Sequence, residues 1–133
     1  MSTEQLDGWI IGQTADALIF ADCDGVIRRW NAAASRIFGF DAAEALGQSL
    51  DIIIPKHLRE SHWRGFDSAI ASGKLKLSGQ PTLTRGLHKD GHKIYVEMTF
   101  ALVTDEQGQV LGSVSIARDV TERVAQEKAA RNS

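Results

Sequence analysis

The sequence predicts an α+β domain in which a five-stranded antiparallel sheet carries helices on one face. Apolar runs with strand-like alternation, separated by turn residues at 22–25, 89–91 and 105–108, predict the strands. Helical spacing with capping residues and glycines between the second and third strands predicts the helices. The predicted order is therefore two strands, several helices and three strands.

The first 16 residues are predicted to form an N-terminal flanking helix. Leu6, Trp9, Ile10 and Ile11 stand at mixed helical spacing, which indicates an amphipathic helix lying on the domain or on a partner. An amphipathic flanking helix must cover its apolar side. We therefore expect either a dimer contact or packing across its own sheet.

Two strands and two short helices open the core. The apolar runs 17–21 and 26–30 form the first antiparallel pair. Asn31 follows as a helix cap, and Gly39 ends that helix. Asp41 opens a second short helix that ends at Gly47.

A longer helix is predicted after Pro55, because proline has no amide hydrogen and restricts the residue before it. The helix should run to Gly73. Four residues fall at i, i+4, i+7 and i+8 on it and share one face: His62, Phe66, Ala69 and Ile70.

A three-stranded meander and a helical tail complete the chain. The strands are expected at 82–88, 92–103 and 110–117. Thr121 is predicted to cap a terminal helix. The predicted organisation is a flanking helix at 1–16, a core at 17–120 and a C-terminal helical tail at 121–133.

Composition excludes several classes of function. The 133 residues, 43% hydrophobic and 24% charged, suit one globular domain. A net charge of -2 argues against nucleic acid, and no apolar run approaches the roughly 20 residues of a membrane span. The lone cysteine, Cys23, fits a reducing compartment, so we expect a cytoplasmic protein. No phosphate-binding glycine loop or nucleophile set indicates an enzyme.

A set of short motifs, in order and at consistent spacing, carries a family resemblance. The motifs are Asp24-Gly25 with Ile27, Asn31-Ala32-Ala33, Ile37-Phe38-Gly39-Phe40, Glu44-Ala45-Leu46-Gly47, Lys89-Asp90-Gly91 and 118–123. With them the chain resembles a PAS domain from about residue 9 to residue 124. The resemblance implies a sensor with a pocket between sheet and helices that holds haem, flavin, a small organic ligand or nothing.

Within that family, the stretch 54–62 is similar to haem-binding sensors, a rhizobial oxygen-sensor kinase and an enteric oxygen-sensor phosphodiesterase. Their iron-binding histidine aligns with His62. The resemblance implies haem b with His62 as the metal ligand, since a neutral imidazole on a rigid helix binds iron well. Phe66, Ala69 and Ile70 would contact the macrocycle, and we expect a diatomic gas or a redox state to be sensed.

The distal side departs from both relatives. Thr82 aligns with the arginine of the kinase, and Gln80 with the methionine ligand of the phosphodiesterase. Either can donate a hydrogen bond to a gas. Met98 and Phe100 share a strand face, and Met98 is either an iron ligand or a core filler. Lys74 and Lys76 are candidates to meet haem propionates.

Other readings stay open. His62 is alternatively a packing or surface residue, and the domain is then a haem-free dimerisation module or a receptor for a small organic molecule. A photochemical flavin adduct is disfavoured, because 52–59 contains no cysteine. His88 and His92 flank a turn but lack an evident third metal ligand. We expect a homodimer that signals to an unknown downstream protein.

Overall fold

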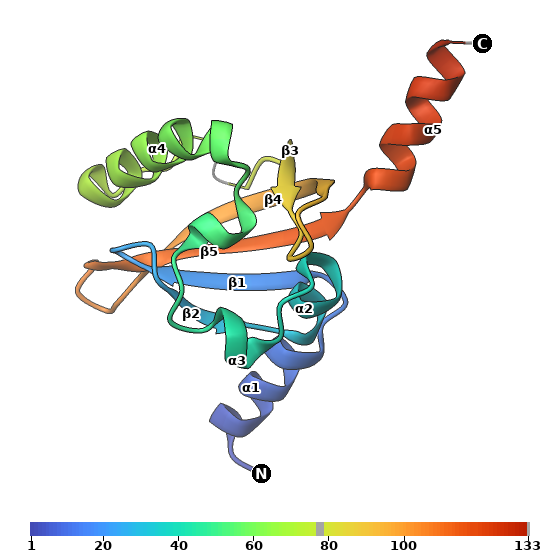
Figure 1. Cartoon of the computed structure of the whole chain (residues 1–133). Helices are drawn as coiled ribbons and strands as arrows, with labels where there is room; N and C mark the ends of the chain where they lie inside the picture. The colour runs from blue at the N-terminus through green and yellow to red at the C-terminus, as the bar shows by residue number, and fades with distance from the viewer. Residues whose placement is uncertain (77–78, 133) are drawn as a thin grey trace.

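Five strands form one antiparallel sheet in the order β2-β1-β5-β4-β3, as the computed structural model in Figure 1 shows. The structure describes residues 1–76 and 79–132, so Ser133 of the predicted tail lies outside the described residues. The strands are β1 (Ala17–Asp22), β2 (Ile27–Trp30), β3 (Thr82–Leu87), β4 (Lys93–Thr104) and β5 (Val110–Asp119). The predicted meander is confirmed, because β3, β4 and β5 are neighbours in sequence order.

Helices α2, α3 and α4 cover one face of this sheet, which confirms the predicted fold class (Figure 1). The helices are α1 (Thr3–Gln13), α2 (Ala32–Phe38), α3 (Ala42–Ala45), α4 (Arg59–Ser72) and α5 (Thr121–Arg131). Two 3-10 turns, η1 (Leu50–Ile53) and η2 (Lys56–Leu58), precede α4. The α-helix expected directly after Pro55 therefore begins at Arg59, after the three residues of η2.

The core lies between the sheet and these helices. Strand alternation turns Ile19 of β1 and Val96 of β4 inward, where both are 1% exposed. Phe38 of α2, also 1% exposed, fills the space above them. Burying such apolar side chains is the main favourable contribution to folding.

Asn31 joins three elements at a buried point. Its side-chain carbonyl accepts the amide hydrogen of Ala34, which makes Asn31 the cap of α2 as predicted. The same carbonyl also accepts the amide hydrogen of Leu18 on β1. Its amide group donates to the carbonyls of Ile11, at 2.9 Å, and Asp16, at 3.0 Å. One side chain thus ties α1, β1 and α2 together.

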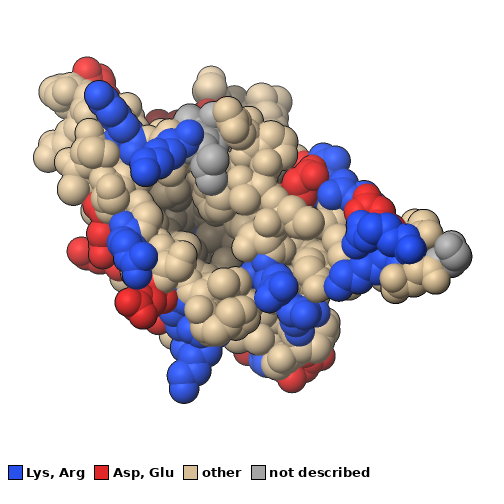
Figure 2. All heavy atoms as spheres, turned by 90° about the horizontal axis from the view of Figure 1, so that it is seen from above, with Lys and Arg blue, Asp and Glu red and all other residues tan. Residues whose placement is uncertain are grey.

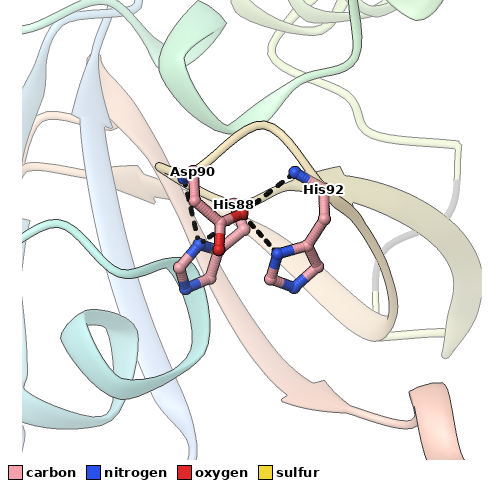
Figure 3. A group of neighbouring side chains, drawn as sticks. All are labelled: His88, Asp90 and His92. Atoms are coloured by element: carbon pink, nitrogen blue, oxygen red, sulfur yellow. Dashed lines mark hydrogen bonds and ion pairs between the residues drawn. The ribbon is translucent and has the colours of Figure 1, made fainter.

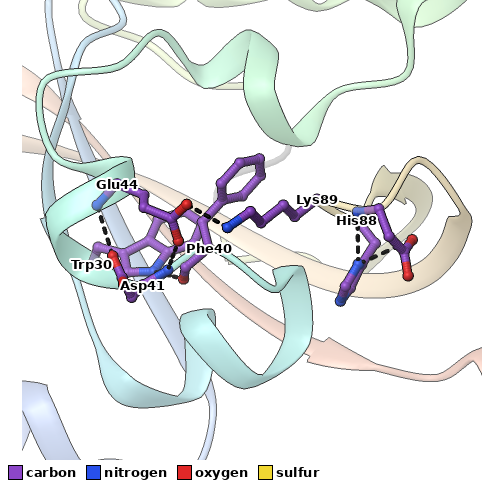
Figure 4. Close-up of polar contacts among 7 residues, drawn as sticks. Trp30, Phe40, Asp41, Glu44, His88 and Lys89 are labelled. Atoms are coloured by element: carbon purple, nitrogen blue, oxygen red, sulfur yellow. Dashed lines mark hydrogen bonds and ion pairs between the residues drawn. The ribbon is translucent and has the colours of Figure 1, made fainter.

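The hairpin turn between β3 and β4 holds the short helices in place. The Lys89 amide donates to the carbonyl of Phe38 at 2.8 Å, and the Lys89 ammonium pairs with Glu44 of α3. Figure 4 shows this lysine reaching from the turn toward Glu44. Asp41 and Glu44 form a capping box at the start of α3, so the turn contacts a helix that is itself well capped.

The junction between β5 and α5 corrects one prediction. The cap position of α5 is Val120, and Thr121 is the first helical residue. The Thr121 hydroxyl instead accepts the Tyr95 amide at 2.9 Å and donates to Asp119 at 2.6 Å. The Val120 amide donates to the Tyr95 carbonyl, so the start of α5 is fastened to β4.

The predicted N-terminal helix is present as α1, is only weakly amphipathic and contains no buried residue. Leu6, Trp9 and Ile10 are 39%, 51% and 57% exposed. The sheet of the same domain therefore does not cover these three side chains. Among the described residues, no helix is both long and apolar enough to cross a membrane.

Candidate ligand cavity

A cavity of about 250 Å³ lies between the inner face of the sheet and the helices. We call it the inner cavity. Its walls are mostly apolar, which suits a ligand with a large hydrophobic surface. Among the described residues, its wall is formed by Ala21, Phe38, Leu50, Ile53, Ile54, Leu58, Ser61, His62, Phe66, Thr82, Thr84, Arg85, Gly86, Val96, Met98, Phe100, Ser113 and Ser115.

His62 of α4 is a half-buried polar side chain in this wall. Its Nδ1 atom is buried and has no hydrogen-bond partner among the described residues. Burial lowers the pKa of His62, although the nearby carboxylates of Asp51 and Asp67 act in the opposite direction. The ring is therefore held in its neutral form, which is the form that binds metals.

Two aromatic rings fix the position of His62. Its ring stacks on Phe66 with 5.9 Å between centroids and meets Trp63 edge-on at 4.7 Å. Trp63 itself donates to the Asp51 carboxylate at 2.7 Å and packs against Gly25. Trp63 is not among the residues that line the inner cavity, whereas Phe66 is.

The glycine at position 25 is required for this packing. A Cβ atom there would fall 2.2 Å from Cη2 of Trp63, and the residue has φ +77°, a left-handed conformation that favours glycine. Arg59 strengthens the same contact region by donating to the carbonyls of Ile54 and Asp51. These contacts attach the first turns of α4 to η1 and to the turn between β1 and β2.

A second space, which we call the outer hollow, adjoins the inner cavity and measures about 940 Å³. The two share a wall of five residues: Ser61, His62, Phe66, Phe100 and Ser113. Arg64, Lys74 and Lys76 also line the outer hollow. Figure 2 shows a hollow in this face with Lys and Arg side chains near its rim. An anionic group at the rim would be favoured by these charges.

The structure places the predicted site residues in two groups. Thr82, Met98 and Phe100 line the inner cavity with His62, and Thr82 and Met98 are register partners on β3 and β4. Ala69 and Ile70 line the outer hollow together with Phe66 and the lysines. The predicted face of α4 therefore lines both the inner cavity and the outer hollow.

Gln80 is the exception. Its side chain is exposed, and it lines neither space. The Thr82 hydroxyl donates to the backbone carbonyl of Gln80 at 3.4 Å, a long hydrogen bond. The residue that faces the cavity from this segment is thus Thr82, and a distal role for Gln80 has no support in this arrangement.

Several cavity residues were missed in the sequence. Thr84 follows Thr82 by strand alternation, and the same alternation along β5 brings Ser113 and Ser115 to the cavity. Arg85 was also missed. These residues add hydroxyl groups and a cation to a wall that the sequence predicted as mainly apolar.

Two other residues with side chains that can bind a metal ion or react lie elsewhere. Cys23, in the turn between β1 and β2, has its thiol 3.3 Å from the carbonyl of Val110 and does not line the inner cavity. His57, in η2, is exposed and lines neither space.

The chain is thus an α+β domain in which an antiparallel sheet and the helices over one of its faces enclose a cavity. The PAS fold family matches residues 12–125, and the chain belongs to that family. PAS domains are typically sensory modules, so a sensory role follows from membership.

Two sensor proteins are similar to part of the chain. The oxygen sensor protein DosP of Escherichia coli strain K12 is 28% identical over 102 residues, 77% of this chain. The sensor protein FixL of Bradyrhizobium diazoefficiens is 29% identical over 82 residues, 62% of this chain. The chain spans only 12% and 16% of those two proteins, respectively.

Solved structures agree on the fold. A PAS domain from Colwellia psychrerythraea has a TM-score of 0.78 at 24% identity, covering 91% of this chain and 99% of that one. An RNA-binding light-oxygen-voltage receptor has a TM-score of 0.72 at 26% identity, covering 99% of this chain and 38% of the other.

Proposed function

We propose that this PAS domain binds haem b through His62 and senses a diatomic gas or a redox state. The observation that carries the proposal is the half-buried imidazole on the wall of a largely apolar cavity, with a buried Nδ1 that has no hydrogen-bond partner among the described residues. A ligating histidine needs one nitrogen for the metal and a defined environment for the other. Similarity to an oxygen sensor protein supports the same function.

Two adjoining spaces with apolar walls and a cationic rim support haem as the ligand. The inner cavity alone is smaller than the roughly 300–1,000 Å³ of typical ligand pockets, but the outer hollow adjoins it through His62 and Phe66. A flat ligand lying across both would place its apolar ring against Phe66 and Ile70 and its carboxylates near Lys74 and Lys76. Bound haem would supply an iron centre for gas binding or electron transfer.

On the opposite wall, Thr82 and Met98 are the residues in position to distinguish ligands. They face the inner cavity from paired positions on adjacent strands. The Thr82 hydroxyl can donate one hydrogen bond to a bound diatomic molecule, since its bond to Gln80 is long. Met98 is 8% exposed and adds an apolar, polarisable contact.

Haem titration of the haem-free protein tests the proposal. We expect an intense Soret band at one equivalent of haem in the wild type. His62→Ala should lose that band, whereas the matched control His57→Ala should keep it, because His57 is exposed and outside both spaces. A wild-type protein that fails to bind added haem, or a His62→Ala variant with an unchanged spectrum, would contradict the proposal.

A small organic ligand is the second candidate, and the size of the inner cavity favours it. At about 250 Å³, with hydroxyl groups from Thr82, Thr84 and Ser115 in its wall, the cavity suits a small partly polar molecule. Native mass spectrometry of protein that shows no Soret band separates this function from that of an empty dimerisation module. A light-driven flavin–cysteine adduct has no support, because Cys23 lies outside the inner cavity.

We also propose that α1 makes a homodimer contact. Leu6, Trp9 and Ile10 are exposed at i, i+3 and i+4, so they form one apolar patch on the helix. Sedimentation velocity of Trp9→Glu against the wild type tests this contact. A wild-type monomer at the highest concentration examined would contradict it.

A further inference from the structure

We infer that the turn between β3 and β4 is a binding site for a divalent transition-metal ion such as Zn²⁺. His88, Asp90 and His92 each offer one ligand atom, and the three atoms lie within 4.8 Å of one another. Two histidines and one carboxylate are a set that zinc uses in proteins, with water in the fourth position. The site is separate from the cavity, so the inference is independent of the function proposed above.

The turn itself brings the three side chains together. The His88 amide donates to the His92 carbonyl, and the Gly91 amide donates to the His88 carbonyl, both at 2.9 Å. Gly91 has φ +95°, which closes the turn at low cost only for glycine. His88 and His92 therefore stand opposite each other with their rings stacked 4.5 Å apart, and Asp90 lies between them (Figure 3).

The distances are close to those of a zinc site. With bond lengths of about 2.0–2.2 Å, two ligand atoms of a tetrahedral zinc ion lie about 3.3 Å apart. Nδ1 of His88 and Oδ1 of Asp90 are 3.2 Å apart. Nδ1 of His92 makes a hydrogen bond to the same oxygen, so this imidazole needs to turn outward to share a metal ion with Asp90.

Hydrogen bonds within the turn hold the Asp90 carboxylate toward the cluster. Its Oδ1 atom accepts the backbone amide of His92 at 3.0 Å and is also hydrogen-bonded to the His92 ring. The Asp90 amide donates to Nδ1 of His88 at 3.2 Å, so this nitrogen is unprotonated and its lone pair accepts that hydrogen bond. A metal ion would replace this long hydrogen bond with a stronger interaction.

The cluster is rigid on one side and open on the other. A Cβ atom at Gly39 would fall 2.5 Å from Cε1 of His88, so the His88 ring is packed closely against the end of α2. The side chains of Asp90 and His92 are 59% and 55% exposed. A fixed first ligand reduces the ordering cost of binding, and the open side gives an ion access from solvent.

Isothermal titration calorimetry with ZnCl₂ tests the site, on protein that carries no polyhistidine tag and no haem. We expect one bound ion in the wild type, with affinity reduced by at least about tenfold in His92→Ala and in Asp90→Asn. Both residues are exposed, so neither substitution should unfold the chain. His57→Ala and His62→Ala, which leave the turn intact, should bind like the wild type.

Cobalt absorption gives an independent readout, because Co²⁺ in a tetrahedral nitrogen and oxygen site has visible bands that His92→Ala should remove. The inference is overturned if the wild type binds no Zn²⁺, or if binding is unchanged in His92→Ala and Asp90→Asn. Loss of Zn²⁺ binding in His62→Ala alone would also overturn it, since the ion would then lie in the cavity.

Discussion

Replacing Asn31 with alanine should destabilise the fold far more than the loss of an ordinary helix cap. The substitution removes the cap of α2, which is worth about 0.5–2 kcal/mol. It also leaves the amide of Leu18 and the carbonyls of Ile11 and Asp16 without their partner. An unsatisfied buried group costs about 1–3 kcal/mol, and part of this cost is recovered where water can enter. We expect a total loss of about 3–4 kcal/mol.

Urea unfolding followed by circular dichroism measures this loss, and two variants separate its parts. Asn31→Ser restores an acceptor for the cap only, so it should recover about 1 kcal/mol. Asp41→Ala removes an exposed cap at α3 and should cost about 1 kcal/mol. If Asn31→Ala costs no more than Asp41→Ala, the bonds from Asn31 to β1 and α1 contribute nothing and the reasoning fails.

Two further predictions concern a glycine and a pH dependence. Gly39→Ala should destabilise by about 1–3 kcal/mol more than Gly47→Ala in thermal unfolding, because both have left-handed φ but only Gly39 meets the His88 ring; equal losses would exclude that contact. In haem-free protein, burial lowers the pKa of His62. As the pH falls below about 6.5, His62 therefore takes up a proton in the unfolded chain before it does so in the folded chain. Stability should therefore decrease from about pH 7.5 to 5.5, and less steeply in His62→Gln; identical slopes would contradict the prediction.

The sequence could predict local features better than the contacts between distant segments. Asn31 as a cap followed from its place before an alanine-rich helix, and Gly39 followed as the end of that helix. The bonds from Asn31 to Ile11, Asp16 and Leu18 could not be predicted, because they depend on how three segments meet in space. Local propensity carries no information on such contacts.

In the candidate site, too, the sequence predicted local features better than contacts between distant segments. Helical spacing predicted that His62 and Phe66 share a face, and both line the inner cavity. Gln80 was placed at the cavity by counting residues from His62, but the structure leaves the Gln80 side chain exposed. The histidine turn was dismissed for want of a third ligand, because the direction of the Asp90 carboxylate depends on the conformation of the turn.

The attachment of α5 to β4 has a mechanical consequence. Val120 and Thr121 are held by the backbone of Tyr95, the neighbour of a cavity residue, Val96. Beyond that point α5 extends away from the sheet (Figure 1). Its 11 residues span about 16 Å, so a rotation of about 5° at its base displaces its far end by about 1.5 Å. A small rotation of β4 at this point would therefore be enlarged at the far end of α5.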